Sequence, residues 1–202
     1  MLPPTTLNVP PLFLGLDPGK KGAIALLSEK NVVFLENLPI DLQSNRIDTL
    51  KLVKLLEPYR NKEIIAYIEE PACYNLTSWA ALSLGTTYGI CLASLLINSN
   101  IQVNAVKART WKKLLGLTSS KLGSKEMAQT LIKGLPTRLR HDKAEAGLLA
   151  IYGELIHSNR ADPTKPGQPI AVAINRKTAK SATKPRLNTT AIPSIRTNVP
   201  QV

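Results

Sequence analysis

Residues 12–28 read Leu-Phe-Leu-Gly-Leu-Asp-Pro-Gly-Lys-Lys-Gly-Ala-Ile-Ala-Leu-Leu-Ser, two short apolar runs joined by a turn. The first run, residues 12–16, has no polar side chain, which is typical of a strand buried on both faces of a sheet. Pro18 and Gly19 then turn the chain, so the second run is the return strand of a hairpin. Asp17 therefore ends a buried strand, where a carboxylate is costly unless a cation offsets its charge.

A second buried run repeats this pattern. Residues 64–70 end in Glu69 and Glu70, which a proline follows. Apolar residues at helical spacing predict a helix at residues 45–56 between the two strands, and a right-handed crossover then places the strands parallel and adjacent. Their carboxyl ends lie together, so Glu69 or Glu70 is expected near Asp17.

Hydrophobic periodicity also predicts the remaining elements. Short turns join the first strands into an antiparallel meander. We expect Ser124 to cap a helix that Gly134 ends, and Cys91 to be a buried thiol in an apolar helix. The predicted elements are a strand at 32–36, a helix at 78–98, a strand at 101–106, and helices at 110–115, 124–133 and 140–156.

The 202-residue chain has a formal net charge of +12, which favours a polyanionic partner, nucleic acid first. Residues 1–11 are a proline-rich leader, and residues 158–202 are expected to be a disordered basic tail around one domain at 12–157. No secretion signal is evident, and the apolar run at 90–97 is too short to span a bilayer, so we expect no membrane partner and a reducing, cytoplasmic location.

Asp142 and Glu145 add an acidic pair on one face of the last predicted helix. Taken singly, Asp142 could only complement the helix dipole, and Asp17 could only form a turn. Four converging carboxylates in a basic protein, however, repel each other unless divalent cations lie among them. Carboxylate oxygens suit Mg²⁺ or Mn²⁺, and two such ions can clamp the attacking and leaving oxygens of a phosphodiester.

Three spaced motifs resemble those of the RuvC family of Holliday junction resolvases, a branch of the ribonuclease H-like nucleases. The resemblance covers about residues 12–156, in the family's order. A glycine-bearing helix and a basic segment lie between the second and third motifs, as in the family. The matching stretches are Gly-Leu-Asp17-Pro-Gly-Lys-Lys-Gly-Ala, Tyr67-Ile-Glu69, Leu84-Gly85-Thr-Thr-Tyr88-Gly89, Trp111-Lys112-Lys113-Leu-Leu-Gly116 followed by Lys125, and His141-Asp142-Lys-Ala-Glu145-Ala.

The resemblance implies an α/β fold of ribonuclease H-like type, a five-stranded mixed sheet with helices on both faces. It implies that Asp17, Glu69, Asp142 and Glu145 are catalytic and hold two Mg²⁺ or Mn²⁺ ions. The implied activity is symmetric paired nicking of four-way DNA junctions by a homodimer, in recombination and repair at the nucleoid. Glu145 stands where bacterial resolvases usually have Asp, so the chain looks closer to the phage and resolvase-like branches.

An aromatic residue and a basic stretch are the candidates for DNA contact. Tyr74 is the candidate to wedge against an unstacked base, although Tyr74 and Trp79 could instead pack their loop onto the core, Trp79 more so. For His141, capping or surface placement is favoured over a role as a base. Phosphate contacts fit the basic stretch, although part of it could be a solvated face; its residues are Lys107, Arg109, Lys112, Lys113, Lys121 and Lys125.

Other functions fit parts of this pattern. An actin-like or sugar-kinase ATPase shares a strand–Asp–Gly turn, but a second glycine-rich phosphate loop is not evident and the other three acids would have no explanation. A nuclease for other branched DNA is compatible with the same acids. A nucleic-acid-binding protein without catalysis would not need an intact set of four.

Overall fold

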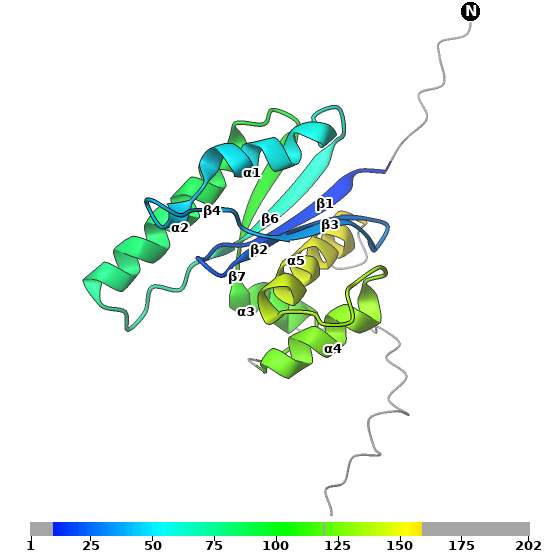
Figure 1. The fold of residues 1–202 in the computed structure, drawn as a ribbon. Coiled ribbons are helices and arrows are strands. Elements are labelled where there is room, and N and C mark those ends of the chain that lie inside the picture. Colours follow the sequence, from blue (N-terminus) through cyan, green and yellow to red (C-terminus); the bar gives the residue numbers. More distant parts are fainter. Residues whose placement is uncertain (1–9, 119, 159–202) are drawn as a thin grey trace, which may run out of the picture. The chain divides into compact units, whose positions relative to one another are not determined.

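A five-stranded mixed sheet in the order β3-β2-β1-β6-β7 is the centre of the computed structural model, which describes residues 10–118 and 120–158 (Figure 1). β1 pairs antiparallel with β2 and parallel with β6, and β7 runs parallel to β6. The antiparallel meander, the parallel crossover and the α/β class are thus confirmed. The strands are β1 (Leu12–Asp17), β2 (Ala23–Ser28), β3 (Asn31–Asn37), β6 (Ile64–Glu70) and β7 (Ile101–Lys107).

The two ends of the chain stay predictions. The proposed leader, residues 1–11, lies outside the described residues apart from Pro10 and Pro11, and the proposed tail, residues 158–202, apart from Ser158. The assignment of residues 12–157 to one nuclease domain is likewise a prediction.

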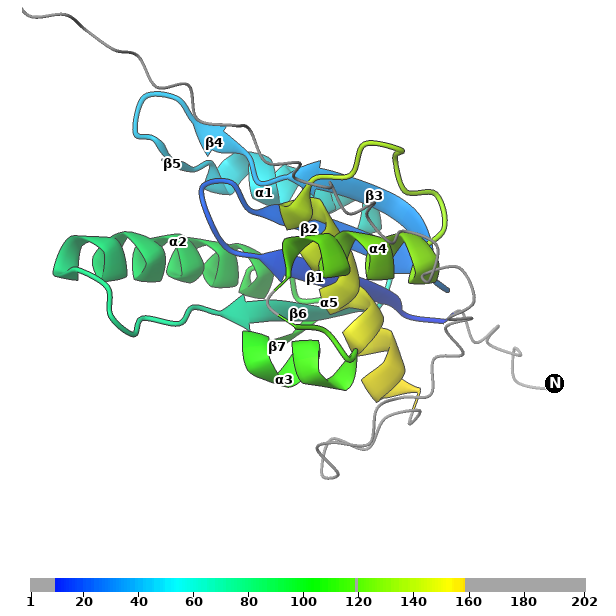
Figure 2. The ribbon, with the colours of Figure 1, turned by 90° about the horizontal axis from the view of Figure 1, so that it is seen from below.

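Helices cover both faces of the sheet, as predicted (Figures 1 and 2). Alternation along β1 sends Phe13 to one side and Leu14 to the other, each into a separate apolar cluster. The Phe13 side packs against α3 (Ala108–Leu114), α4 (Lys121–Leu131) and α5 (His141–His157). The Leu14 side packs against α1 (Thr49–Leu56) and α2 (Ser78–Leu96).

The helix predicted at 45–56 begins later than expected. Arg46 and Ile47 form β5 (Arg46–Ile47), which pairs with β4 (Ile40–Asp41) in a small separate hairpin. α1 starts at Thr49 because the Asp48 carboxylate accepts the Lys51 backbone N–H at 3.0 Å and so caps the helix. A 3₁₀ turn, Glu57–Tyr59, follows it.

The prediction that Ser124 caps α4 is wrong. Ser120 is the N-cap, since its hydroxyl accepts the Gly123 N–H at 3.3 Å, and Ser124 lies buried inside the helix. Gly134 has a φ of 81° and lies beyond Leu131, the last residue of α4, so it does not end the helix.

Two glycines allow backbone segments to approach closely, one in β1 and one in the β1–β2 turn. A Cβ on Gly15 of β1 would lie 2.0 Å from the Ala146 carbonyl oxygen and 2.6 Å from the Ala150 nitrogen, so α5 rests directly on the backbone of β1. In the β1–β2 turn, a Cβ on Gly22 would lie 2.1 Å from the Asp17 carbonyl oxygen. Space, and not an unusual φ, therefore requires glycine at both positions.

In the described part of the chain, α2 is the one helix long and apolar enough to cross a membrane by length and composition alone. The expectation of no membrane partner stays a prediction. Cys91, Ser94 and Leu95 on its C-terminal half are buried in the domain core, which confirms the buried thiol.

We expect Gly15→Ala to lower the free energy of unfolding by about 3 kcal/mol or more, because the added methyl group collides with the α5 backbone. Urea denaturation measures the change. Gly123→Ala is the matched control, since its methyl group would meet only Ser120 atoms at 3.7–3.9 Å, and it should be neutral or stabilising by up to about 1 kcal/mol. Equal stability of the two variants would contradict the direct β1–α5 contact.

Candidate active site

Four acids from three segments converge at the carboxyl end of β1. Leu16 pairs with Ile68, so Asp17 and Glu69 lie side by side at the carboxyl ends of two parallel strands. Asp142 and Glu145 occupy the first turns of α5, which crosses β1. Burial raises the pKa of Asp17 to about 7, and the carboxylates of the other three acids add to this rise. The other three predicted acids thus all lie within electrostatic reach of Asp17.

The structure separates the two neighbouring glutamates. Glu69 faces the other acids: burial raises its pKa, opposed by a hydrogen bond from Trp111 and by the charge of Lys112. Glu70 instead lies near Tyr88 on α2, whose pKa is raised by burial and further by the Glu70 carboxylate. The alternation of a strand therefore puts Glu69 with the acids and Glu70 on the opposite face, as expected.

Glu145 is the most heavily contacted of the four. Its side chain is 8% exposed, and the Lys112 ammonium lies 2.6 Å from its Oε1. The buried Ser124 hydroxyl donates to the same oxygen at 3.2 Å. His141, one helical turn earlier, places Nε2 3.3 Å from it. Three partners from α3, α4 and α5 thus fix the orientation of this carboxylate.

Trp111, beside Lys112 on α3, holds a second acid. Its indole N–H donates to Glu69 Oε2 at 2.7 Å, and the ring is fully buried. The Lys112 ammonium lies 5.0 Å from the centroid of that ring. Two consecutive residues of one short helix therefore fix Glu69 and Glu145.

The first turn of α5 is held from both sides. Arg140, its N-cap, pairs with Asp142 at 3.0 Å, and Lys143 donates to the Leu35 carbonyl oxygen of β3 at 3.0 Å. The preference for His141 as a cap or a surface residue was wrong. Its ring contacts Glu145 and lies 3.9 Å from Asp142, so it belongs to the acidic cluster.

No group of three or more His, Cys, Asp or Glu side chains within residues 10–118 and 120–158 is close enough to share one metal ion. The donors nevertheless fit a hard divalent cation, since all four acids offer oxygen. Burial first, and then the three neighbouring carboxylates, raise the pKa of Asp17, and the Lys112 ammonium only partly opposes this rise.

Four of the six predicted DNA-contacting basic residues line one pocket beside the acids. This α3–α4 pocket has a volume of about 740 Å³ and is also lined by His141. Lys107 lies outside it at the end of β7, paired with Glu70 in the sheet, and Lys125 lies outside it on α4. The basic residues that line the pocket are Arg109, Lys112, Lys113 and Lys121.

Tyr74 and Trp79 are 84% and 78% exposed, so packing of these rings onto the core, considered above, is wrong for both. Tyr74 lies in the loop between β6 and α2, and Trp79 in the first turn of α2. Both rings are accessible to a partner.

The sequence did not identify Trp111, Ser124 and His141 as site residues. His141 had a usable signal, because it stands four residues before Glu145 on one helix face. Trp111 and Ser124 had none, since their contacts depend on how α3 and α4 pack onto α5.

We expect the stability of the protein in EDTA to fall as the pH rises from about 4 to about 7. The pKa of Asp17 is near 4 in the unfolded chain and about 7 in the folded one, so the folded state binds the extra proton in this range. Asp17→Asn weakens this dependence, of which the raised pKa of Glu69 leaves a part, and raises the free energy of unfolding at pH 8 by up to about 4 kcal/mol. Urea denaturation at pH 5 and pH 8 measures it.

Asp41→Asn is the control for this experiment, because hydrogen bonds from Ser44 lower the pKa of Asp41. Asp41 stays ionised from pH 5 to pH 8, so its loss should leave the pH profile parallel to that of the wild type. A profile of Asp17→Asn that is also parallel to the wild type would contradict the raised pKa.

Comparison with known proteins places the fold. No protein-family model and no curated protein sequence matches the chain. The solved structure of Thermus thermophilus RuvC with a Holliday junction substrate matches with a TM-score of 0.58 and 15% identity, over 73% of this chain and 96% of that one. Another T. thermophilus RuvC structure matches with a TM-score of 0.56 and 17% identity, over the same shares. At these identities, the likeness shows that the chain has the ribonuclease H-like fold of RuvC.

Proposed function

We propose that this protein is a metal-dependent endodeoxyribonuclease that cuts four-way DNA junctions by paired symmetric nicks. The convergence of Asp17, Glu69, Asp142 and Glu145 beside a basic pocket carries the proposal, since burial and the three neighbouring carboxylates together raise the pKa of Asp17 to about 7. The fold shared with RuvC supports it. The proposal places the protein in the RuvC family, on its phage and resolvase-like side, acting at the nucleoid in recombination and repair.

The four acids would hold one or two Mg²⁺ or Mn²⁺ ions, which when bound would supply Lewis acidity and a water nucleophile for in-line hydrolysis of the phosphodiester. Trp111 would keep Glu69 aimed at the cluster through its indole N–H. Ser124 and His141 would orient Glu145. Glu145 is one methylene longer than Asp, which lets it reach inward from the second turn of α5.

Lys112 would serve both the acids and the DNA. Its ammonium pairs with Glu145 and also lines the α3–α4 pocket. In this proposal, Arg109, Lys113 and Lys121 bind backbone phosphates in that pocket, while Lys107 and Lys125 contact DNA outside it. Tyr74 would stack on an unpaired base at the junction centre, since its exposed ring stands on the loop directly after Glu69 and Glu70.

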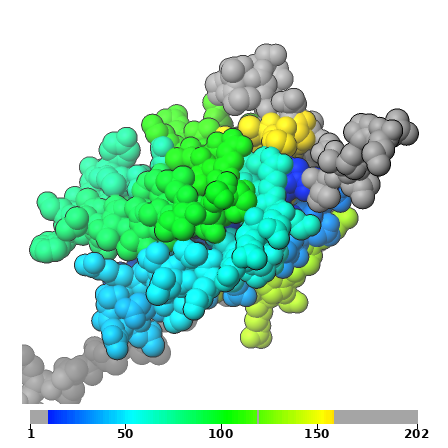
Figure 3. Space-filling model, turned by 90° about the horizontal axis from the view of Figure 1, so that it is seen from above, coloured from blue at the N-terminus to red at the C-terminus, as the bar shows by residue number. Residues whose placement is uncertain are grey.

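A homodimer would match the two-fold symmetry of a four-way junction. α2 offers the surface for it, which Figure 3 views from the α1–α2 side. Leu82 and Leu96 are 59% and 60% exposed on this helix. A Cβ on Gly85 or Gly89 would meet no atom within 4 Å, so a second helix could approach closely there.

We expect the full-length protein to make paired nicks in a synthetic four-way junction with Mg²⁺, and to leave a linear duplex of the same sequence uncut. EDTA, Asp17→Asn and Glu69→Gln should each reduce the cleavage rate by at least about 100-fold, because each removes charge from the metal site. Gel analysis of end-labelled strands measures the rate. Glu70→Gln is the matched control and should stay within about threefold of wild type, since Glu70 faces α2.

Other outcomes separate the alternatives. Junction binding without cleavage would replace the nuclease with a nucleic-acid-binding protein. Cleavage of flaps or single strands in place of the junction would keep the metal site and change the substrate. If Asp17→Asn were as active as wild type, the proposal that the four acids form the catalytic site would be wrong.

We expect Gly89→Glu to convert the dimer into a monomer, because a charged side chain would enter the proposed α2 interface. Sedimentation equilibrium measures the mass. Leu122→Glu on α4 is the control: Leu122 is 65% exposed and distant in sequence from α2, so its replacement should leave the dimer intact. A wild-type monomer, or a dimer that survives Gly89→Glu, would rule out this interface.

A further inference from the structure

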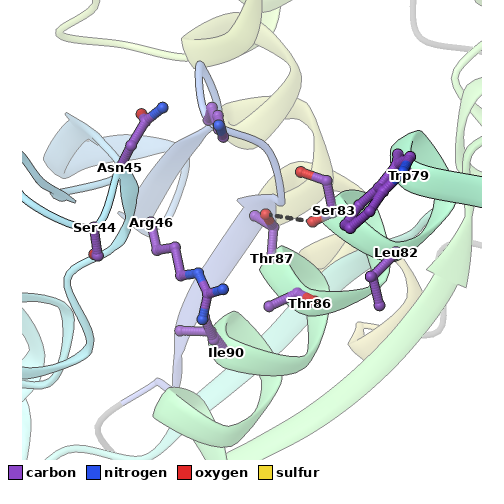
Figure 4. A pocket seen from close by; sticks show the side chains of 10 residues that line it. Ser44, Asn45, Arg46, Trp79, Leu82, Ser83, Thr86, Thr87 and Ile90 are labelled. Atoms are coloured by element: carbon purple, nitrogen blue, oxygen red, sulfur yellow. Dashed lines mark hydrogen bonds between the residues drawn. The ribbon is translucent and has the colours of Figure 1, made fainter.

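A second basic pocket lies between the β4–β5 hairpin, the β1–β2 turn and α2 (Figure 4). We call it the Lys20–Arg46 pocket, after the two cations that line it, and its volume is about 350 Å³. Ser83 and Thr86 of α2 line it opposite Arg46, and Trp79 lies at the N-terminal end of that wall. It shares no lining residue with the α3–α4 pocket.

The charges of this pocket are not compensated within the described chain. Lys20 and Arg46 are both exposed, and neither forms an ion pair with another described residue. No acid lines the pocket. Asp41, which faces Arg46 across the hairpin, uses its carboxylate to accept the backbone N–H groups of Gln43 and Ser44. The two cations share the pocket with the hydroxyl groups of Ser83 and Thr86 and with apolar side chains of α2. Cations beside hydroxyl donors suit an oxyanion.

The hairpin fixes the backbone of Arg46 before any ligand arrives. The hydrogen bonds to Asp41 close the loop at residues 42–45, where Asn45 has a φ of 52°. β5 also contacts α2, so Arg46 is carried on a packed element. Binding at this wall of the pocket therefore needs ordering of the Arg46 side chain but not of the backbone that carries it.

The pocket is close to the acids but on the other face of the sheet. Lys20 follows Asp17 by three residues, so their Cα atoms are at most about 11 Å apart. A DNA strand advances about 3.4 Å along the duplex axis per nucleotide. A strand with one phosphate at the acids can therefore place a nearby phosphate of the same strand within reach of the pocket that Lys20 and Arg46 line.

We propose that the Lys20–Arg46 pocket binds a backbone phosphate of the DNA strand, flanking the phosphate at the four acids. The choice of DNA as the polyanion rests on the proposed nuclease function. The two cations supply charge-assisted hydrogen bonds, the α2 hydroxyls add neutral ones, and Trp79 offers an exposed face to the adjoining sugar or base.

The test compares full-length wild type with K20A/R46A and with the control R60A/K62A. The control removes the same charge just before the amino end of β6, whereas the acids lie at the carboxyl ends of the strands. Binding of a synthetic four-way junction is titrated with Ca²⁺ at several NaCl concentrations. We expect K20A/R46A to reduce the slope of log K against log salt by about 1 to 2, and the control to change it by less than about 0.5.

A second measurement locates the phosphate. Junctions carry one uncharged methylphosphonate at successive positions of the bound strand. We expect one or two adjacent substitutions to weaken binding by wild type and to have no further effect on K20A/R46A. An unchanged slope for K20A/R46A, equal slope changes in both double variants, or no position at which the effects overlap would overturn the proposal.

The remaining outcomes separate this pocket from the nuclease. Junction cleavage by wild type with an unchanged slope for K20A/R46A refutes the pocket alone. The expected slope change without cleavage refutes the nuclease alone. If wild type does not bind the junction, both fail. If K20A/R46A changes the sedimenting mass, the pocket contacts a second copy of the chain, which also overturns the proposal.

Discussion

The concentration of negative charge at the carboxyl end of β1 is the constraint on which the rest of the structure depends. Asp17 cannot ionise at its ordinary pH, because burial and three neighbouring carboxylates raise its pKa to about 7. Two consecutive residues of α3 stabilise the other acids: the Trp111 indole N–H donates to Glu69, and the Lys112 ammonium pairs with Glu145. Such a cluster is tolerable only where partners are supplied at fixed positions, and it leaves affinity for further positive charge.

That arrangement requires α5 to lie directly on the sheet. Gly15 removes the side chain that would separate them, and the close contact brings the first turns of α5 over the end of β1. A displacement of α5 by the width of one methyl group would carry Asp142 and Glu145 away from Asp17 together. The glycine two residues before Asp17 is therefore as much a part of the site as the acids are, although it touches no substrate.

Much of this could be predicted from the sequence, and the failures have two causes, misplaced helix caps and contacts set by helix packing. Asp17 and Glu69 could be placed together because strand alternation and the parallel crossover are local rules with long-range consequences. Two helix starts were placed at the wrong residue: Asp48 caps α1, and Ser120, not Ser124, caps α4. Trp111 and Ser124 escaped notice because their partners depend on the rotation of α3 and α4 against α5, which no local pattern specifies.

Lys112 links the internal balance of charge to the proposed binding of DNA. The Lys112 ammonium carries one charge and lies at the boundary between the acids and the α3–α4 pocket, so a phosphate and Glu145 would each share its attraction. A divalent cation among the acids would weaken the hold of Glu145 on this ammonium and free it for a phosphate. A phosphate that drew Lys112 away would in turn leave Glu145 with a greater need for the metal. In the proposed nuclease, metal and DNA therefore bind with positive coupling, and by linkage each strengthens the other by the same factor.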